Sequence, residues 1–335
     1  MKIIMDMYGD DNAPLAPLKG AALAVKEYGV EIVAVGDEAE MKKLCAENGI
    51  STEGFEFIDA PLVMPVCAEP TEAVKSYKES SLTVGLKALA DGLGDAYVGA
   101  GSTGAIVVAA TLIVKRIKGI KRAALASVIP GLEKDYMLLD LGANVECRPE
   151  MLNQFGMMGS IYMENVEGVK NPKVALVNIG EESSKGTDLQ KTAYSLMEKA
   201  GYNFVGNVEA RDVPSGKVCD VAVADGWTGN IILKTIEGLG GAFGKLIKGM
   251  LLKNIFTKLS ALALKGGLSE FKQKLDYTKR GGAPLLGIAR PVIKAHGSSN
   301  PEAFKNAINQ AKIFVETDVN ATISAALLKL KEDEE

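Results

Sequence analysis

The residues best suited to take part in a reaction lie between Val174 and Thr187, where a short apolar run rich in β-branched residues precedes a polar loop. The run predicts a buried strand, and helical spacing of apolar residues begins after Thr187. Amide groups at the start of such a helix can bind anions in open α/β sheets, and Lys185 stands just before it. On this loop alone, an ordinary turn with a solvated lysine is the simpler interpretation.

The same loop resembles a nucleotide P-loop only superficially. A P-loop needs Gly-Lys-Ser/Thr after the four-residue gap, but here Lys185 precedes Gly186. Glu181 and Glu182 also place negative charges where phosphates would lie. A second stretch, 99–104, fits the dinucleotide pattern Gly-x-Gly-x-x-Gly after a predicted strand, yet no acidic residue follows about 20 residues later to hold a ribose. We therefore expect no nucleotide cofactor.

Composition excludes several other classes. The chain has 335 residues, a net charge of −4 and 47% hydrophobic residues, so nothing suggests a nucleic-acid partner. Its four cysteines are far apart, which argues against a disulfide framework and a zinc site and suits a reducing cytoplasm. His296 is the only histidine, so mechanisms and metal sites that need two are excluded. The N-terminus turns acidic too soon for a signal peptide.

Regular alternation of apolar runs and helical patterns indicates an α/β fold with a mainly parallel sheet. The expected strands include Lys2–Asp6, Glu31–Val35, Phe55–Asp59, Ala96–Gly99, Ala124–Ile129, Met137–Leu141, Val174–Ile179, Val218–Ala224 and Val292–Ala295. A hairpin is expected across the turn 131–135. One helix is predicted over Thr71–Asp91, one over Ala105–Ile117, one over Ile231–Leu239, and a final helix from Pro301 to about Lys331 with a possible break near Asp318.

Two stretches carry clustered cations. The first holds Lys115, Arg116, Lys118, Lys121 and Arg122, which we interpret mainly as a solvated helix end with cations near the negative end of the helix dipole. The second, residues 239–275, is predicted as an amphipathic helical hairpin. Its lysines, Lys245, Lys248, Lys253 and Lys258, alternate with apolar residues. Contact with a membrane surface or an acidic partner, and a core helix with a lysine-rich outer face, are equally consistent with this pattern.

Several ordered motifs together resemble a known family. They are Asp11-Asn-Ala-Pro14, Ala100-Gly-Ser-Thr-Gly-Ala105, Asp140-Leu-Gly-Ala-Asn144, Gln154-Phe-Gly-Met-Met-Gly-Ser160, Asn178-Ile-Gly-Glu-Glu182 with Lys185-Gly186, Gly206-Asn-Val-Glu209, Asp225-Gly226, Gly229-Asn230, Lys234-Thr-Ile-Glu-Gly238, Gly281-Gly-Ala-Pro-Leu-Leu-Gly287 and Lys294-Ala-His-Gly-Ser-Ser299. Over essentially its whole length the chain resembles the PlsX family, the acyl-ACP:phosphate acyltransferases of bacterial phospholipid synthesis. Two positions depart from the usual pattern: Asp10 stands where a second glycine is usual, and Ser102 where asparagine is usual.

The resemblance implies a fold, an activity and partners. The fold would be a three-layer α/β/α domain over residues 1–335, with two lobes around a cleft, like isopropylmalate dehydrogenases and phosphotransacetylases. The reaction would convert long-chain acyl-ACP (acyl carrier protein) and inorganic phosphate to acyl phosphate and free ACP, without metal or cofactor. The protein would be a cytoplasmic homodimer with transient membrane contact, acting before a glycerol-3-phosphate acyltransferase.

It also implies site residues. The catalytic candidates are Lys185, which would hold phosphate, His296, which would protonate the leaving sulfur or donate to the oxyanion, and Asn230. His296 as a purely structural residue is an equal alternative. The candidates for binding phosphate or acyl phosphate are Asp11, Asn12, Ser102, Gly104, Asn144, Asn178, Gly180, Glu182, Gly186, Asp225, Lys234 and Lys294. Rival readings are a phosphotransacylase using acyl-CoA, a dehydrogenase of related fold, and a non-enzymatic scaffold for lipid synthesis.

Overall fold

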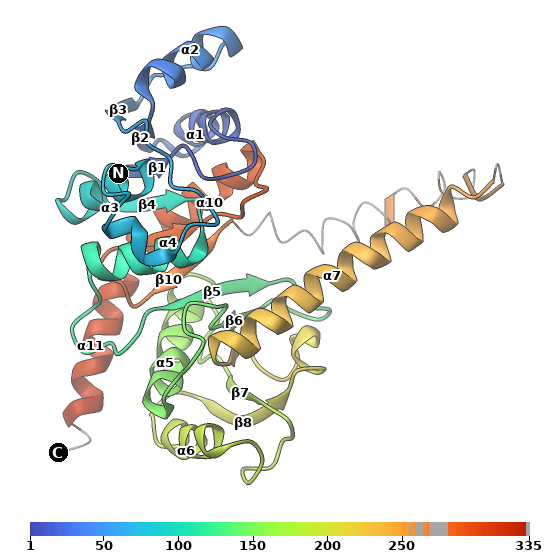
Figure 1. Cartoon of the computed structure of the whole chain (residues 1–335). Helices are drawn as coiled ribbons and strands as arrows, with labels where there is room; N and C mark the ends of the chain where they lie inside the picture. Colours follow the sequence, from blue (N-terminus) through green and yellow to red (C-terminus); the bar gives the residue numbers. More distant parts are fainter. Residues whose placement is uncertain (255, 259–260, 262–263, 265, 268–280, 333–335) are drawn as a thin grey trace.

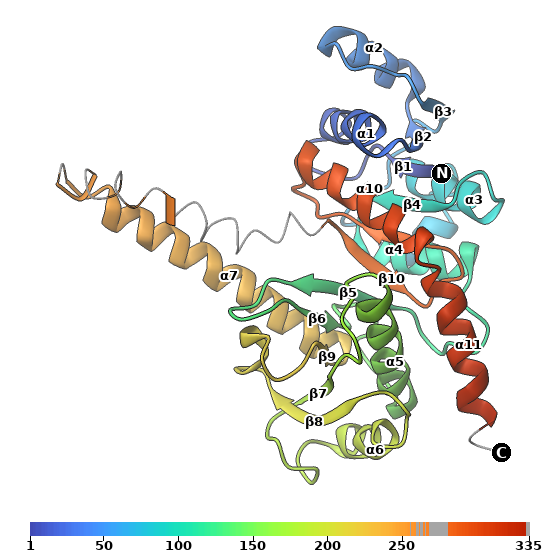
Figure 2. The same ribbon diagram turned by 180° about the vertical axis from the view of Figure 1, so that it is seen from behind.

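A single mixed sheet organises the computed structural model (Figures 1 and 2), which describes residues 1–254, 256–258, 261, 264, 266–267 and 281–332. Among these residues the strand order is β3-β2-β1-β4-β11-β10-β5-β6-β9-β7-β8. The strands are β1 (Lys2–Asp6), β2 (Glu31–Gly36), β3 (Phe55–Asp59), β4 (Ala96–Gly99), β5 (Ala124–Ile129), β6 (Tyr136–Leu139), β7 (Val174–Asn178), β8 (Phe204–Glu209), β9 (Val221–Val223), β10 (Ala283–Leu286) and β11 (Val292–Lys294).

The sheet reverses direction in its middle. β1, β4 and β11 are parallel, but β11 pairs antiparallel with β10, β10 with β5, and β5 with β6. Beyond β6 the pairing with β9 and then β7 is parallel again. β1, β4 and β11 therefore run opposite to β6, β9 and β7, and the loops at their carboxyl ends form two separate groups.

Helices cover both faces of the sheet, which confirms the α/β prediction. One buried cluster includes Leu18, Phe155, Phe304 and Ile323. The other includes Leu86, Ala105 and Val114. The helices are α1 (Leu15–Tyr28), α2 (Glu38–Asn48), the 3₁₀ helix η1 (Pro70–Val74), α3 (Ser81–Ala90), α4 (Thr103–Ala109), the π-helix η2 (Ala110–Val114), α5 (Pro149–Asn165), α6 (Asp188–Met197), the 3₁₀ helix η3 (Val213–Ser215), α7 (Gly226–Leu251), α10 (Pro301–Glu316) and α11 (Val319–Glu332). The described residues contain no helix long and apolar enough to cross a membrane.

Three local predictions need correction. The single helix over Thr71–Asp91 is wrong: η1 and α3 are separate, and Ser80, placed in the helix middle by pattern, is the N-cap that accepts from the Thr83 amide. Serine favours caps because its hydroxyl binds free backbone amides. The next predicted helix ends at Val114, not at 117. β8 was not predicted from the sequence. The break near Asp318 is confirmed, since this residue has a φ of 47° between α10 and α11.

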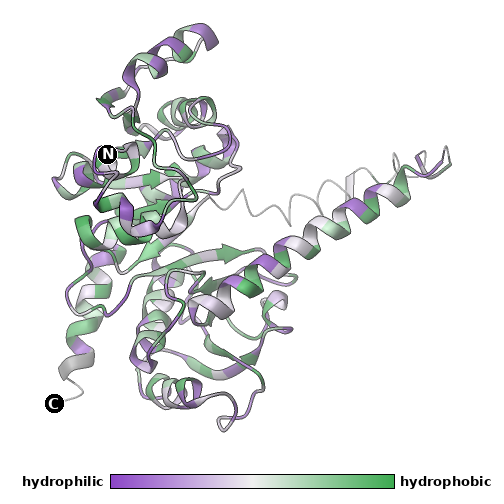
Figure 3. Cartoon of the chain, viewed as in Figure 1, coloured by the Kyte–Doolittle hydropathy of each residue, from purple (hydrophilic) through white to green (hydrophobic). Residues whose placement is uncertain are grey.

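Helix α7 begins against the sheet, and its C-terminal part projects away from the rest of the described chain (Figures 1 and 3). It is one continuous helix from Gly226, longer than the predicted Ile231–Leu239, and only Gly226 and Gly229 are buried. Phe243 and Met250 are 58% and 70% exposed. Residues 239–251 therefore do not pack into the core of this chain. The second arm of the predicted hairpin, residues 268–275, lies outside the described residues.

Candidate active site

The loops that follow β1 and β11 meet at one edge of the sheet. The backbone amide of Asp11 donates to the carbonyl of Gly297 at 2.8 Å, and the Asn12 side-chain amide donates to the carbonyl of Ser299 at 3.3 Å. These contacts bring two predicted substrate-binding residues beside the His296 loop.

The glycine-rich turn after β4 joins the same edge. Gly9 lies so close to this turn that a Cβ on it would be 2.9 Å from the Cα of Gly101, so the close approach requires a residue without a side chain. Ser102 follows directly. Gly104 lies one position inside α4, packed against Pro70. Ser102 thus joins Asp11, Asn12 and His296 in what we name the first loop group.

Lys294 provides a cation in this group. It is the last residue of β11, opposite Gly99 of β4, and its side chain is half-buried. Burial lowers the pKa of Lys294, the Lys234 ammonium lowers it further, and Glu237 opposes both. Within the described residues Lys234 pairs with Glu237 at 2.7 Å, whereas Lys294 has no ion-pair partner. A bound phosphate would supply the opposite charge that Lys294 lacks.

His296 is held in one protonation pattern. The backbone amide of Ser298 donates to its Nδ1 at 3.2 Å, which needs a lone pair on that nitrogen, so the neutral ring carries its proton on Nε2. Burial lowers the pKa of His296, and Lys294 lowers it further, so the charged ring is disfavoured. The arrangement suits a neutral hydrogen-bond donor better than a charged acid.

Asp140 organises the second loop group, after β6, β9 and β7. Its fully buried carboxylate accepts from the amides of Leu125, Ala143 and Asn144 at 3.0, 3.1 and 2.7 Å, and from the Asn144 side chain at 2.8 Å. Burial raises the pKa of Asp140, and these hydrogen bonds oppose the shift. Since Asn144 also donates to the Ala123 carbonyl at 2.7 Å, its side-chain amide is used in holding this loop.

The start of α7 belongs to the second group. Both carboxylate oxygens of Asp225 accept from Thr228, from its amide and from its hydroxyl, each at 2.9 Å, so Asp225 is the N-cap of the helix. The amide of Gly226 donates to the Asn144 carbonyl at 2.8 Å. Asn230 lies one turn further along. Lys234 and Glu237 of the same helix lie near Lys294 and His296, so α7 connects the two loop groups.

The Lys185 loop lies at the far side of the second group. Asn178 donates to the Lys185 carbonyl at 3.2 Å, and Asn207 donates to the Glu182 carbonyl at 2.9 Å. Gly180 packs against the Lys185 side chain, and Gly186 packs against Asn178. All these partners belong to the loop itself, β7 or β8. Lys185 is exposed, and no described residue forms an ion pair with it.

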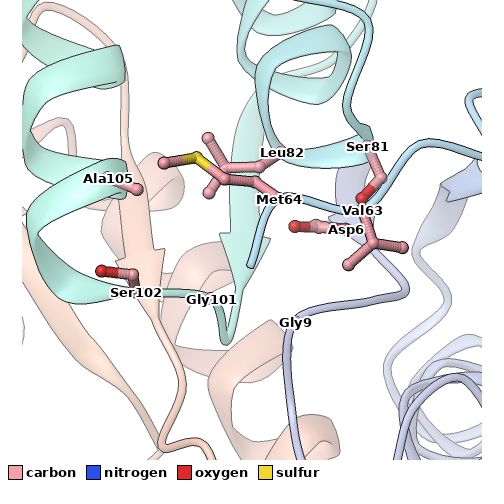
Figure 4. Close-up of a pocket in the computed structure, with 9 residues that line it drawn as sticks. All are labelled: Asp6, Gly9, Val63, Met64, Ser81, Leu82, Gly101, Ser102 and Ala105. Carbon is pink, nitrogen blue, oxygen red and sulfur yellow. The ribbon is translucent and has the colours of Figure 1, made fainter. Parts of the chain in front are cut away.

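Asp6 is a buried acid that none of the sequence motifs includes. It ends β1, is 2% exposed, and lines a small pocket with Ser81 and Ser102 (Figure 4). The Tyr8 amide donates to it at 3.1 Å and the Tyr97 hydroxyl at 3.4 Å. Burial raises the pKa of Asp6 to about 7. An aspartate at the carboxyl end of a buried apolar run is the sequence signal for such a residue, and Asp140 shares it.

Asp10, one of the two departures from the family pattern, is a half-buried carboxylate in the first loop. Its Oδ1 accepts from the Asn12 amide at 2.7 Å, but its buried Oδ2 has no hydrogen-bond partner. Burial is the main cause that raises the pKa of Asp10 to about 6. The first loop therefore carries a half-buried carboxyl with a raised pKa and one unpaired oxygen.

Comparison with known proteins identifies the family of this chain. The family model described as "Fatty acid synthesis protein" matches residues 1–322. A phosphate acyltransferase of Alkaliphilus oremlandii is 46% identical over 334 residues, covering 100% of this chain and 99% of the relative. One from Oceanobacillus iheyensis is 44% identical over 336 residues, covering 100% of both. The chain belongs to the PlsX family of phosphate acyltransferases.

Solved structures agree on the fold of this family member. A phosphotransacetylase from Streptococcus pyogenes has a TM-score of 0.65 at 16% identity, covering 94% of each chain. The EutD phosphotransacetylase from Staphylococcus aureus has a TM-score of 0.62 at 20% identity, covering 93% of this chain and 94% of its own. The prediction of a three-layer, phosphotransacetylase-like fold is confirmed. The family model and the curated relatives show that the protein is an acyltransferase.

Proposed function

We propose that this acyltransferase converts long-chain acyl-ACP and inorganic phosphate to acyl phosphate and free ACP. The observation that carries the proposal is the full-length similarity to phosphate acyltransferases. The Lys294 ammonium, without an ion-pair partner among the described residues and close to Lys234, supports a phosphate site within the first loop group.

In this proposal phosphate binds beside Lys294 and Lys234, with the Ser102 hydroxyl and the amides of its turn as neutral donors. The second loop group would supply the remaining substrate contacts, from Lys185, Gly180, Gly186, Asn178, Glu182, Asn144, Asn230 and Asp225. Among them, the exposed Lys185 provides a second cation for phosphate or for the acyl phosphate product. Asp11 and Asn12 fix the first loop on the His296 loop.

A phosphate oxygen attacks the thioester carbonyl carbon, and the carbon–sulfur bond breaks as the tetrahedral intermediate collapses. The proton of the attacking phosphate goes to the leaving thiolate, so the products are acyl phosphate and the carrier thiol. The neutral His296 Nε2–H is suited to donate to the developing oxyanion, with Asn230 as a further donor. Binding phosphate and the thioester next to each other in the reactive orientation increases the rate, because the two reactants no longer have to meet by diffusion.

Acyl phosphate is a reactive mixed anhydride, so it must be consumed by an acyl transfer, and glycerol 3-phosphate acylation in phospholipid synthesis is the proposed next step. We further propose a homodimer, with the two lobes of the domain enclosing the site. The protein would be cytoplasmic and reach the membrane surface through α7, where Lys245 and Lys248 alternate with exposed Phe243, Leu246 and Met250, followed by Lys253 and Lys258.

The test is trapping of acyl phosphate with hydroxylamine after incubating the purified chain with palmitoyl-ACP and phosphate, with palmitoyl-CoA in parallel. We expect hydroxamate from palmitoyl-ACP. Product from palmitoyl-CoA alone would favour the phosphotransacylase alternative. No product from either would contradict the proposed reaction.

A further inference from the structure

Five cations lie together in the loop between η2 and β5, and we name them the 115–122 patch: Lys115, Arg116, Lys118, Lys121 and Arg122. All five residues are exposed, and none forms an ion pair with a described residue. The stretch contains no acidic residue, although the whole chain carries a net charge of −4. The patch is therefore a local positive region on an acidic protein. Lys115 is the C-cap of the π-helix, as a helix-end interpretation expects, and the other four cations lie in the loop beyond it.

The loop backbone is fixed on the body of the protein. Ile117 and Ile120 are buried, at 7% and 5% exposed. The Ile117 amide donates to the Gly287 carbonyl at 3.0 Å, and the Ala289 amide donates to the Lys115 carbonyl at 2.9 Å. Cations on a fixed loop lose less conformational freedom on binding than cations on a mobile one.

Two motif residues without another role hold this loop. The Gln154 side chain accepts from the Lys121 amide at 2.8 Å and donates to the Gly119 carbonyl at 3.0 Å. Gly287 has a φ of 89°, and a Cβ there would lie 2.9 Å from Ile120 Cγ2, so this turn requires glycine. The Gln154 and Gly287 motifs thus position the patch.

The patch is continuous with the second loop group. Ala123, directly after Arg122, accepts from the Asn144 side chain at 2.7 Å. Burial raises the pKa of the Cys147 thiol to about 12, and the nearby Arg122 acts in the opposite direction. The cations therefore lie beside the loop that carries Asn144 and meets the start of α7.

We propose that the 115–122 patch is the docking surface for the acidic face of the acyl carrier protein, a proposal that rests on the function proposed above. Charge complementarity would steer the carrier and orient its thioester arm toward the neighbouring site loops. A protein partner fits better than a lipid surface, because the two large apolar side chains of the stretch, Ile117 and Ile120, are buried. Membrane-binding segments combine cations with exposed apolar residues, as α7 does.

The test compares the double variant Lys118→Glu/Lys121→Glu with the matched double variant Lys26→Glu/Lys199→Glu. The control lysines are also exposed and without described ion pairs, and both variants change the net charge equally. Initial rates are measured with acyl-ACP and with the uncharged octanoyl thioester of N-acetylcysteamine, at several salt concentrations.

For the patch variant we expect about a tenfold rise in KM for acyl-ACP, a weaker dependence of that KM on salt, and an unchanged rate with the small thioester. The control should behave like the wild type. An unchanged KM for acyl-ACP in the patch variant would overturn the proposal, as would an equal rise in the control. Loss of vesicle flotation without a change in KM would also overturn it and would assign the patch to lipid. Failure of the wild type to use either thioester would instead contradict the proposed function.

Discussion

At the scale of residues, the burial of two acids is a feature that composition does not indicate, although Asp140 belongs to one of the sequence motifs. Asp6 and Asp140 each end an apolar strand and lie within the core, where hydrogen bonds from neighbouring loops satisfy them. Burial raises the pKa of both carboxyls and hydrogen bonds oppose the shift at both, but at Asp6 the nearby Asp10 charge raises the pKa further. Its neighbour Tyr97 is equally buried. This predicts a measurable link between pH and stability.

The variant Asp6→Asn tests this link. The pKa of Asp6 is raised to about 7 in the folded protein, whereas the pKa of an aspartate in the unfolded chain is near 4. As the pH rises from the unfolded pKa to the folded pKa, the wild type therefore loses roughly 1.4 kcal/mol of stability per pH unit. Asparagine removes the titration. We expect Asp6→Asn to gain stability relative to the wild type from pH 5 to pH 8 in urea unfolding. The same difference at both values would show that Asp6 does not titrate in this range.

Two variants of His296 distinguish a role as hydrogen-bond donor from a role as general acid. If neutral Nε2–H stabilises the oxyanion, His296→Gln, whose side-chain amide can also donate, should keep far more activity than His296→Ala. We expect about a 100-fold loss of kcat in the alanine variant, within the range for removing one oxyanion donor. The pH–rate profile of the glutamine variant should resemble that of the wild type. Equal losses in both variants would favour a proton-transfer role.

At the scale of elements, the two ends of α7 differ in how they pack against the described residues. A Cβ on Gly229 would lie 2.0 Å from the Asp140 carbonyl oxygen, whereas no described atom lies within 4 Å of a Cβ on Gly244. Gly229→Ala should therefore destabilise the protein by about 1–3 kcal/mol through overpacking. Gly244→Ala, in the same helix, should stabilise it by about 0.5–1 kcal/mol through helix propensity. Urea unfolding measures both variants, and the prediction requires changes of opposite sign in the free energy of unfolding.

Most strands and helices can be predicted from the sequence, because their apolar residues alternate with clear periodicity. The strand boundaries of β1 and β3 agree with the sequence prediction to the residue. The structure brings the predicted candidates Asp11 and Asn12 beside the His296 loop, and their role in the reaction stays a prediction. The reversal of the sheet at β10 and β5 was not predicted. It depends on pairing between strands far apart in the chain, and it decides that Lys185 and His296 belong to different loop groups.

At the scale of the whole molecule, α7 exposes apolar side chains that no described residue covers, and we propose that they contact a membrane surface. The double variant Phe243→Ser/Met250→Ser removes two exposed apolar side chains without touching the described core. We expect it to lose flotation with anionic vesicles while its melting temperature and its turnover in solution stay the same. Unchanged flotation would contradict membrane contact by α7, and a lower melting temperature would point to packing against another copy instead.

The measurement that tests the central claim most directly is the rate of thiol release from acyl-ACP as a function of phosphate concentration, in the wild type, Lys294→Met and Lys185→Ala. We expect release to require phosphate in the wild type. Lys294→Met should raise the KM for phosphate at least tenfold, because it removes a charge-assisted contact, and Lys185→Ala should raise it too. The KM for acyl-ACP should stay nearly constant in both variants. Thiol release without phosphate, or an unchanged phosphate KM in both variants, would contradict a phosphate acyltransferase site built on these loops.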